Sequence, residues 1–467
     1  MISDVRRSPL RSVAWFAAFA LAPLGALSAC TDDDATPRQH FDDDASPGTP
    51  DAGATPDATA EDARGAFDPK DEPVVCATAP CVTQIVAGAR HFCARISDGT
   101  VRCWGDDARG QRGLDPAGGD ADAGATVTGL TGVTQISAAG TTTCARLDDQ
   151  SVRCWGGNEH GQLGRALDPP TDEDPHPIPE RVAIDAVARV DVGERSVCAT
   201  TAAGGAICWG NDDSAQLARG EPAGTGLPPE PAQLGAVVRR TAAGFDTAFA
   251  IDEHGGLLSW GAVAGSAGVL SGRVSSITPN AVPAPVHALG PVTSFAVSGQ
   301  TPGVLPPPNG LPGDPGVPNQ HACAVTNGDV YCWGKSERGA LGSGLPDPVL
   351  PRPTIARLTT TAYAQQIAAG GETTCVRLTD GNIACTGENE LGQLGTGQVG
   401  PFASAFTTAI TLNGRAVQVA VAEQAVCALL VDGTVKCWGG NLHGEVGLGT
   451  VDDDPHPSAT QVPFPLP

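Results

Sequence analysis

Basic residues are scarce in this chain. Lysine and arginine number 28 against 52 aspartates and glutamates, which leaves a net charge of −24. Nucleic-acid binding needs a basic patch that neutralises phosphates, so this balance argues against nucleic acid as a partner.

Helix signals are also few. The 467 residues include a single methionine but 60 glycines and 40 prolines, so the chain is rich in turns. Its length is large for one ordinary core but suits an array in which each unit packs only on its neighbours.

Motifs of catalysis and metal binding are missing. There is no Gly-x-Ser-x-Gly elbow, phosphate loop, His-Glu-x-x-His or spaced carboxylate pair that stands clear of the background. The cysteines also lack the short Cys-x-x-Cys spacing typical of zinc sites. We therefore predict no catalytic residues, no metal and no cofactor.

One apolar run, residues 13–29, follows Arg6, Arg7 and Arg11 and is too short and too early for a membrane span. It ends in Leu27-Ser28-Ala29-Cys30, which resembles the lipobox of bacterial lipoproteins. We therefore predict a signal peptide at 1–29 and lipid attachment at Cys30. A plain secretory signal cut after Ala29 is the alternative.

Residues 30–74 carry much of the acidity, including two runs of three aspartates at 32–34 and 42–44. Without the signal peptide the chain holds 25 basic and 51 acidic residues, a charge of about −26. So polar a stretch has nothing to bury, which predicts a disordered tether. A flexible chain of this length would reach roughly 35 to 40 Å.

Seven near copies of Cys-Ala-x-x-x-x-Gly-x-Val-x-Cys-Trp-Gly fill the chain after residue 82. The first positions are separated by 51, 54, 51, 74, 52 and 52 residues, and they are Cys93, Cys144, Cys198, Phe249, Cys323, Cys375 and Cys427. A repeat of this length predicts one supersecondary unit per copy, as in propellers and solenoids.

The cysteines other than Cys30 form an even set, as expected for disulfides in an exported chain. Within a copy, a turn centred on Asp98-Gly99 or, in the shorter fifth copy, on Asn327-Gly328 would place the two cysteines opposite each other. The fourth copy lacks both and has Phe249 and Ser259. The predicted bonds are Cys76 with Cys81, Cys93 with Cys103, Cys144 with Cys154, Cys198 with Cys208, Cys323 with Cys332, Cys375 with Cys385, and Cys427 with Cys437.

The rest of each unit reads as further strand and turn. An apolar run ending in glycine, such as Val82 to Gly88, precedes each hairpin, and a Gly-Gln-Leu-Gly turn such as 161–164 follows it. A proline-rich link with one more extended stretch leads to the next copy. Three or four strands per unit predict a blade.

This order of motifs resembles the regulator-of-chromosome-condensation repeat, over roughly residues 82–467. The resemblance implies an all-β, seven-bladed propeller, which we place at residues 75–467. The functions of this family are diverse, since it includes a nuclear exchange factor, domains of signalling proteins and secreted bacterial inhibitors of β-lactamase. The signal sequence and acidity argue against the first of these.

Several repeated residues have a structural interpretation beside a functional one. The six tryptophans of the copies could stack sugars, but a residue repeated in one register more often fills the core. His91 and His321 share one register and His160 and His443 another, which favours packing or turn roles. Two acidic segments at 172–177 and 452–457 could bind calcium, although solvated loops are the simpler interpretation.

The clearest break in the pattern lies between Gly299 and His321. Most copies have two residues here, but this one has 21, with seven prolines and four glycines among residues 300–320. We interpret this insertion as a candidate partner-binding element, the alternative being a harmless surface loop. Its apolar residues are Val304, Leu305, Leu311 and Val317.

The sequence thus predicts a monomeric, lipid-anchored propeller of the bacterial cell envelope that binds or scaffolds another protein and touches the membrane only through its lipid. The alternatives are a carbohydrate-active hydrolase or lyase that uses the central face, and an inhibitor of an envelope enzyme. We further expect either residues 72–75 or, preferably, residues 461–464 to supply a missing strand of the first blade and close the ring.

Overall fold

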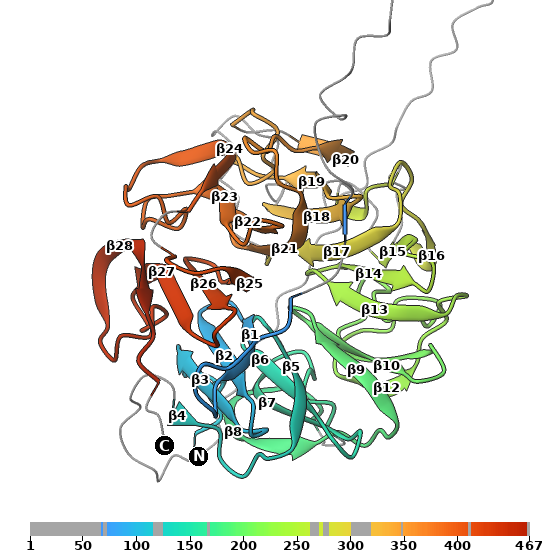
Figure 1. Ribbon diagram of the computed structural model, residues 1–467. Helices are drawn as coiled ribbons and strands as arrows, with labels where there is room; N and C mark the ends of the chain where they lie inside the picture. The colour runs from blue at the N-terminus through green and yellow to red at the C-terminus, as the bar shows by residue number, and fades with distance from the viewer. Residues whose placement is uncertain are drawn as a thin grey trace, which may run out of the picture. The chain divides into compact units, whose positions relative to one another are not determined.

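Seven antiparallel sheets of four strands surround a common centre in the computed structural model (Figure 1). The structure describes residues 67–68, 72–114, 125–165, 169–261, 270–273, 280–299, 319–346, 349–409 and 412–464, all within one compact unit. These residues contain no α-helix, and so none that is long and apolar enough to cross a membrane. The predicted all-β, seven-bladed propeller is confirmed.

Each of the first four repeats forms one blade, with its strands in chain order from the centre outward. They are β1 (Val82–Ala87), β2 (His91–Ile96), β3 (Val101–Gly105) and β4 (Ala125–Thr126); β5 (Val133–Ala139), β6 (Thr142–Leu147), β7 (Val152–Asn158) and β8 (Asp172–Arg181); β9 (Val187–Val192), β10 (Ser196–Thr201), β11 (Ala206–Gly210) and β12 (Leu227–Pro231); β13 (Val238–Ala243), β14 (Thr247–Asp252), β15 (Leu257–Gly261) and β16 (Asn280–Pro285).

The last three repeats follow the same plan. Their strands are β17 (Val292–Val297), β18 (Gln320–Thr326), β19 (Asp329–Lys335) and β20 (Val349–Ile355); β21 (Ala364–Gly370), β22 (Thr373–Leu378), β23 (Ile383–Glu388) and β24 (Phe402–Thr408); β25 (Ala416–Val421), β26 (Ala425–Leu430), β27 (Val435–Asn441) and β28 (Asp452–Gln461).

The expected closure of the ring by a borrowed strand is wrong. The first blade has its own four strands, β1 to β4, and the C-terminal β28 is the outer strand of the seventh blade. Side-chain and backbone contacts close the seam instead: Trp104 of the first blade donates its indole N–H to the Glu445 carbonyl at 2.9 Å, Phe464 packs edge-on against Trp104, and the Glu423 N–H donates to the Ala89 carbonyl at 2.8 Å. Because each repeat already contains an outer strand, none has to be supplied from elsewhere.

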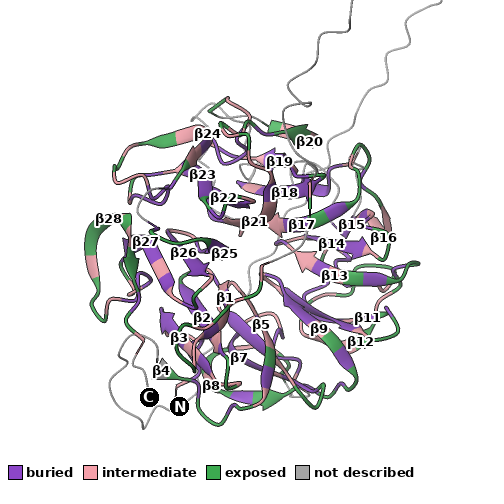
Figure 2. Ribbon diagram, in the orientation of Figure 1, coloured by how far each residue is buried: buried purple, intermediate pink, exposed green. Residues whose placement is uncertain are grey.

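Buried residues are concentrated on the inner strands of the blades, whereas the outer strands are more exposed (Figure 2). The tryptophans lie on the third strands and contact the preceding blade. All six are at most 1 % exposed, as the core interpretation predicts. Each indole N–H donates to a carbonyl in the turn after the third strand of the preceding blade, most often that of a glutamine. The pairs are Trp104 with Glu445, Trp155 with Gln111, Trp209 with Gln162, Trp260 with Gln216, Trp333 with Leu270 and Trp438 with Gln393, at 2.7 to 2.9 Å.

This contact explains the last glycine of the Gly-Gln-Leu-Gly turn. A side chain at Gly164 would place its Cβ 2.9 Å from the indole nitrogen of Trp209, and the backbone there has φ +61°. Only glycine meets both conditions without strain. The two sequence motifs are therefore the two halves of one junction between blades.

The sixth blade has Thr386 in the tryptophan register and solves the packing differently. Phe406, on the outer strand β24 of the same blade, is fully buried and lies against Gly342 of the preceding blade, where the other junctions have an indole. Thr386 Oγ1 lies 2.8 Å from the Ala403 carbonyl oxygen. A phenylalanine from the outer strand thus replaces the missing tryptophan.

The structure contains all seven predicted disulfides. In the six intra-blade bonds the cysteines are directly paired across the second and third strands, with Cα atoms 4.1 Å apart. The turns match the prediction, since Gly99 has φ +82° and Asn327 and Gly328 both have positive φ. In the fourth blade Phe249 faces Ser259 and packs 4.9 Å from the Phe295 ring.

Candidate functional site

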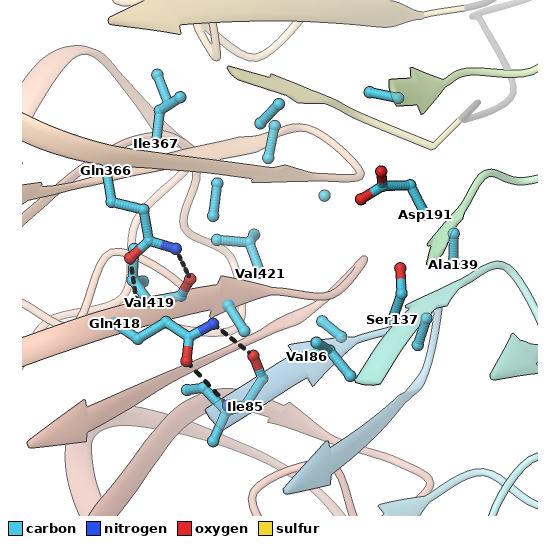
Figure 3. Close-up of a pocket in the computed structure, with 18 of the residues that line it drawn as sticks. Ile85, Val86, Ser137, Ala139, Asp191, Gln366, Ile367, Gln418, Val419 and Val421 are labelled. Carbon is cyan, nitrogen blue, oxygen red and sulfur yellow. Dashed lines mark hydrogen bonds between the residues drawn. The ribbon is translucent and has the colours of Figure 1, made fainter. Parts of the chain in front are cut away.

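The seven innermost strands line a central cavity of about 580 Å³, which we call the hub (Figure 3). Its walls combine small apolar side chains, such as Ala139, Ala242 and Ala420, with polar and charged ones, and more of the accessible lining is polar than apolar. The hub volume falls within the range of small-molecule sites in proteins.

A β-bulge recurs near the start of every innermost strand, for example between Val82 and Gln84. A bulge turns the following side chain away from the regular alternation. In four blades that side chain is a glutamine that reaches the next blade and bonds both the N–H and the C=O of one residue there. These pairs are Gln84 with Ile136, Gln135 with Val190, Gln366 with Val419 and Gln418 with Ile85, at 2.6 to 3.0 Å, the last two drawn in Figure 3.

Three blades depart from this glutamine register. The fifth blade has Ser294, whose hydroxyl accepts from the Ile367 N–H at 3.1 Å. The third and fourth blades have Arg189 and Arg240, and both line the hub. Between the third and fourth blades, Asp191 replaces the glutamine as acceptor, taking the Thr241 N–H at 3.1 Å.

Asp191, Arg189 and Arg240 form a charge cluster on one side of the hub. Asp191 is buried, accepts from Arg189 Nε at 2.7 Å through one carboxylate oxygen, and bonds Thr241 through the other. Arg240 Nε lies 3.9 Å from that carboxylate, too far for a hydrogen bond. Burial and, to a smaller extent, repulsion from Arg189 lower the pKa of Arg240 to about 10. Attraction by Asp191 raises this pKa but does not offset the two other effects.

The two ends of the hub differ. The innermost strands all begin at one end of the hub, which we call the entry face. They all stop at the other end, which we call the exit face. Residues before β1 lie against the entry face: Arg415 Nε donates to Glu72 at 3.2 Å, the Val75 N–H donates to the Val431 carbonyl at 2.7 Å, and the Phe67 ring packs on Tyr363. The end of the segment predicted as tether therefore contacts the propeller.

The exit face carries charged pairs that join neighbouring blades. Arg90 lies 3.1 Å from Glu423 and Arg109 lies 2.9 Å from Glu159. Arg195 and Asp246, and Arg338 and Glu388, form longer pairs at 3.8 and 3.7 Å. The side chains of Asp246 and Glu388 are 29 and 22 % exposed, and this partial burial raises the pKa of both carboxyls.

The predicted lipid and partner-binding residues lie outside the residues that the structure describes. These are Cys30 and the insertion residues Val304, Leu305, Leu311 and Val317. The structure does place the residues that flank the insertion: Gly299 lines the hub, and Gln320 bonds the Ser298 carbonyl at 3.1 Å. The chain therefore leaves and re-enters at the exit face.

The repeated histidines take structural positions, as predicted. His91 and His321 are buried between blades, and their Nε2 atoms lie 2.8 and 2.6 Å from Thr143 and Thr374 Oγ1. His160 and His443 lie half-buried in exit-face turns, where the His160 N–H donates to the side chain of Gln162. All four thus contribute to packing or turn geometry.

The two acidic segments are strands rather than loops, since they begin β8 and β28. Asp172 bonds His176 at 2.6 Å, and Asp452 bonds His456 at 2.8 Å. In the part of the chain that the structure describes, no three metal-ligand side chains come together.

Comparisons with known proteins agree with this geometry. Models of the Regulator of chromosome condensation (RCC1) repeat match residues 82–111, 133–162, 327–377 and 364–393. The chain is 26 % identical to the Ultraviolet-B receptor UVR8 of Arabidopsis thaliana over 376 residues, 78 % of each protein. The chain is a seven-bladed propeller that carries RCC1-type repeats.

Other proteins match in part or in fold alone. Human X-linked retinitis pigmentosa GTPase regulator is 28 % identical over 137 residues, which cover 29 % of this chain and 13 % of that protein. The structure of human WBSCR16 has a TM-score of 0.62 at 20 % identity, covering 76 % of this chain and 88 % of that one. Prp20p of Saccharomyces cerevisiae has a TM-score of 0.63 at 17 % identity, covering 83 % and 88 %.

Sequence reasoning missed the charge cluster of the hub. Asp191, Arg189 and Arg240 do not belong to any catalytic motif, and they lie in the apolar runs that precede the hairpins. The signal was present in the glutamine register, which reads Gln84, Gln135, Arg189, Arg240, Ser294, Gln366 and Gln418 down the seven repeats. The tertiary structure is needed to see that the bulge turns this register toward the next blade and the hub.

Proposed function

We propose that this chain is a lipid-anchored propeller of the bacterial cell envelope that binds another protein through its exit face. The observation that carries the proposal is the position of the segment before β1, which lies against the entry face through Glu72, Val75 and Phe67. A chain anchored at Cys30 would reach the propeller from that side.

The exit face lies at the opposite end of the hub from residues 67–75, and we assign the partner to it. Its arginines are partly exposed, with 50 % of the Arg90 side chain and 38 % of that of Arg338 accessible. Arginine is enriched in protein interfaces because its planar fork makes several directed bonds. Prp20p of Saccharomyces cerevisiae, which shares this fold, binds Gsp1p and histones, and this supports a binding role for the propeller.

Partner binding is tested by affinity capture from detergent-solubilised envelope. We expect the double variant R90E/R338E to reduce capture of the bound protein at least about tenfold. Each substitution places a negative charge beside an existing glutamate and removes an arginine that would contact the partner. The matched control is R181E, on the outer strand β8, where 57 % of the side chain is exposed. Equal capture by all three proteins would refute the exit face as the binding surface.

Partner contact by the insertion at residues 300–320 is a separate prediction within this proposed function. Deletion of residues 301–318 should weaken capture without lowering the unfolding midpoint if the insertion contacts the partner. Unchanged capture by the deletion variant would favour a harmless surface loop.

Anchoring is tested by membrane fractionation. We expect the wild-type chain to require detergent for release and C30S to be released without it, because the thiol of residue 30 is the proposed site of acylation. A C30S protein that still sediments with membranes would refute the lipid anchor.

A further inference from the structure

The hub contains an arginine, Arg240, that shares its nearest carboxylate with a second and closer arginine. Arg240 lines the cavity, and none of its nitrogens makes a hydrogen bond to the described residues. Its Nε atom is buried and unpartnered. The Arg240 side chain as a whole is 39 % exposed and lines the hub, so an anion that enters the cavity can reach the guanidinium.

The nearest carboxylate is already in use. Asp191 gives one oxygen to Arg189 and the other to the backbone and hydroxyl of Thr241. The remaining acids of the hub lie at its two ends beside other arginines: Glu72 pairs with Arg415, Glu423 with Arg90, and the charge of Glu194 acts on Arg195. The Asp191, Arg189 and Arg240 cluster therefore has an excess of one positive charge.

The repeats show that this charge is not needed for the fold. The same register holds glutamine in four blades and serine in a fifth, and these side chains bond the next blade. At Arg240 no such bond to the fifth blade is present among the described residues. The fourth blade has thus exchanged an inter-blade bond for a guanidinium that faces a cavity.

We propose that the hub is a binding site for a monovalent carboxylate, held by the guanidinium of Arg240. A planar guanidinium pairs with a carboxylate through two parallel bonds, and one negative charge matches the excess charge of the cluster. Alanines of the wall, such as Ala242 and Ala243, leave room for a short aliphatic group attached to the carboxylate. A dianionic phosphate is less favoured, because it would leave an uncompensated charge in a chain of net charge −24.

This carboxylate can come from a free small acid or from the C-terminus of a polypeptide that enters the hub. The proposal goes beyond protein binding at the exit face and holds whether or not that face has a partner. Loss of capture by R90E and R338E tests the exit face, whereas the variants below leave it unchanged.

The test uses saturation-transfer NMR on the oxidised full-length protein at constant ionic strength. The probes are acetate, N-acetyl-trialanine, its C-terminal amide and methylphosphonate, each of which has a methyl signal to observe. We expect acetate and the free acid of the peptide to bind, and the amide not to bind. Tighter binding of the peptide acid than of acetate would identify a chain terminus as the ligand. Equal binding of the two probes would identify a small acid as the ligand.

Variants decide the role of Arg240. R240Q should weaken acetate binding at least about tenfold through loss of the paired bonds. It should not lower the unfolding midpoint, since glutamine is the residue of this register in four other blades. R239Q is the matched control, because Arg239 is the exposed neighbour on β13 and does not line the hub.

D191N should have the opposite effect and tighten acetate binding several-fold. Asparagine can still accept from Thr241 but no longer competes for the two guanidinium groups. A purely structural ion pair would not give this increase. Binding unaffected by R240Q, equal binding of the peptide amide, or tighter binding of methylphosphonate than of acetate would each overturn the proposal.

Discussion

At the scale of single residues, position within the repeat decides what a side chain does. The tryptophan of the Cys-Trp-Gly motif is a plug whose N–H reaches the preceding blade, for example from Trp209 to the Gln162 carbonyl at 2.7 Å. Where the motif fails, at Thr386, a buried Phe406 fills the same junction from another strand. Two different sequences thus satisfy one packing requirement.

This exchange can be reversed by a double substitution. F406A alone should destabilise the protein by about 3 to 5 kcal/mol, because it leaves a cavity at the junction. T386W alone should also destabilise it, by about 1 to 3 kcal/mol, since Phe406 already occupies the space. The double variant copies the seventh blade, where Trp438 packs with Ala459.

We therefore expect T386W to be stabilising in the F406A background, by about 2 kcal/mol, as the indole is buried and its N–H bonded. Guanidinium unfolding of the four proteins measures this coupling. Purely additive losses would show that the indole and the phenyl ring do not share a site.

At the scale of elements, hairpins and bulges are repeated even where residues differ. The turn residue with positive φ is glycine in five copies, at Gly99, Gly204, Gly255, Gly381 and Gly433, but Gln150 with φ +66° in the second. Between blades, buried histidines replace smaller residues: His91 and His321 hold the register that contains Thr142 and Thr373 elsewhere.

These histidines make stability depend on pH. Burial lowers the pKa of His91 and of His321 to about 4 from 6.5. Between these values the unfolded chain binds more protons than the folded chain, so their contribution is complete above pH 6.5 and is lost as the pH falls toward 4. Each accounts for at most about 3 kcal/mol.

We expect the unfolding midpoint of wild type to fall more steeply between pH 7 and 4.5 than that of H91T with H321T. Burial raises the pKa of some carboxyls, such as Asp107 and Asp246, and these groups change the stability with pH in the opposite direction. Their contribution is the same in both proteins, so it cancels when the profile of the variant is subtracted from that of wild type. H254T, at a side chain 85 % exposed, is the control and should keep the wild-type slope. Parallel pH profiles for all three proteins would contradict the buried neutral histidines.

At the scale of the whole molecule, side-chain and backbone contacts close the ring. Val462 is buried in the cluster that contains Trp104, and Gln418 bonds both backbone groups of Ile85 across the same seam. Each blade is complete within its repeat, so closure rests on the same junction contacts that join the other blades.

Truncation tests this closure. A chain ending at Gln461 keeps β28 but loses Val462 and Phe464, which pack against the first blade. We expect its unfolding free energy to fall by about 2 to 4 kcal/mol through lost burial. A chain ending at Phe464 is the control and should unfold like wild type. Equal midpoints for both truncations would show that the C-terminal residues do not hold the seam.

The repeat alone was sufficient to predict the blades, the hairpin turns and the cysteine pairs. These depend on local rules: a period of about 51 residues, glycine at positive φ, and direct opposition across a short turn. The tryptophan motif and the Gly-Gln-Leu-Gly turn were both visible in the sequence, but not the bond that joins them across neighbouring blades.

Tertiary structure decided the closure of the ring, the role of Phe406 and the hub. Arg240 lies 49 residues from Asp191 in the chain, yet the two line the same cavity because adjacent innermost strands converge there. A period identifies what is common to the repeats, whereas the hub cluster arises from what differs between them. Such differences acquire meaning only when packing brings them together, because charge and cavity are properties of the assembled ring.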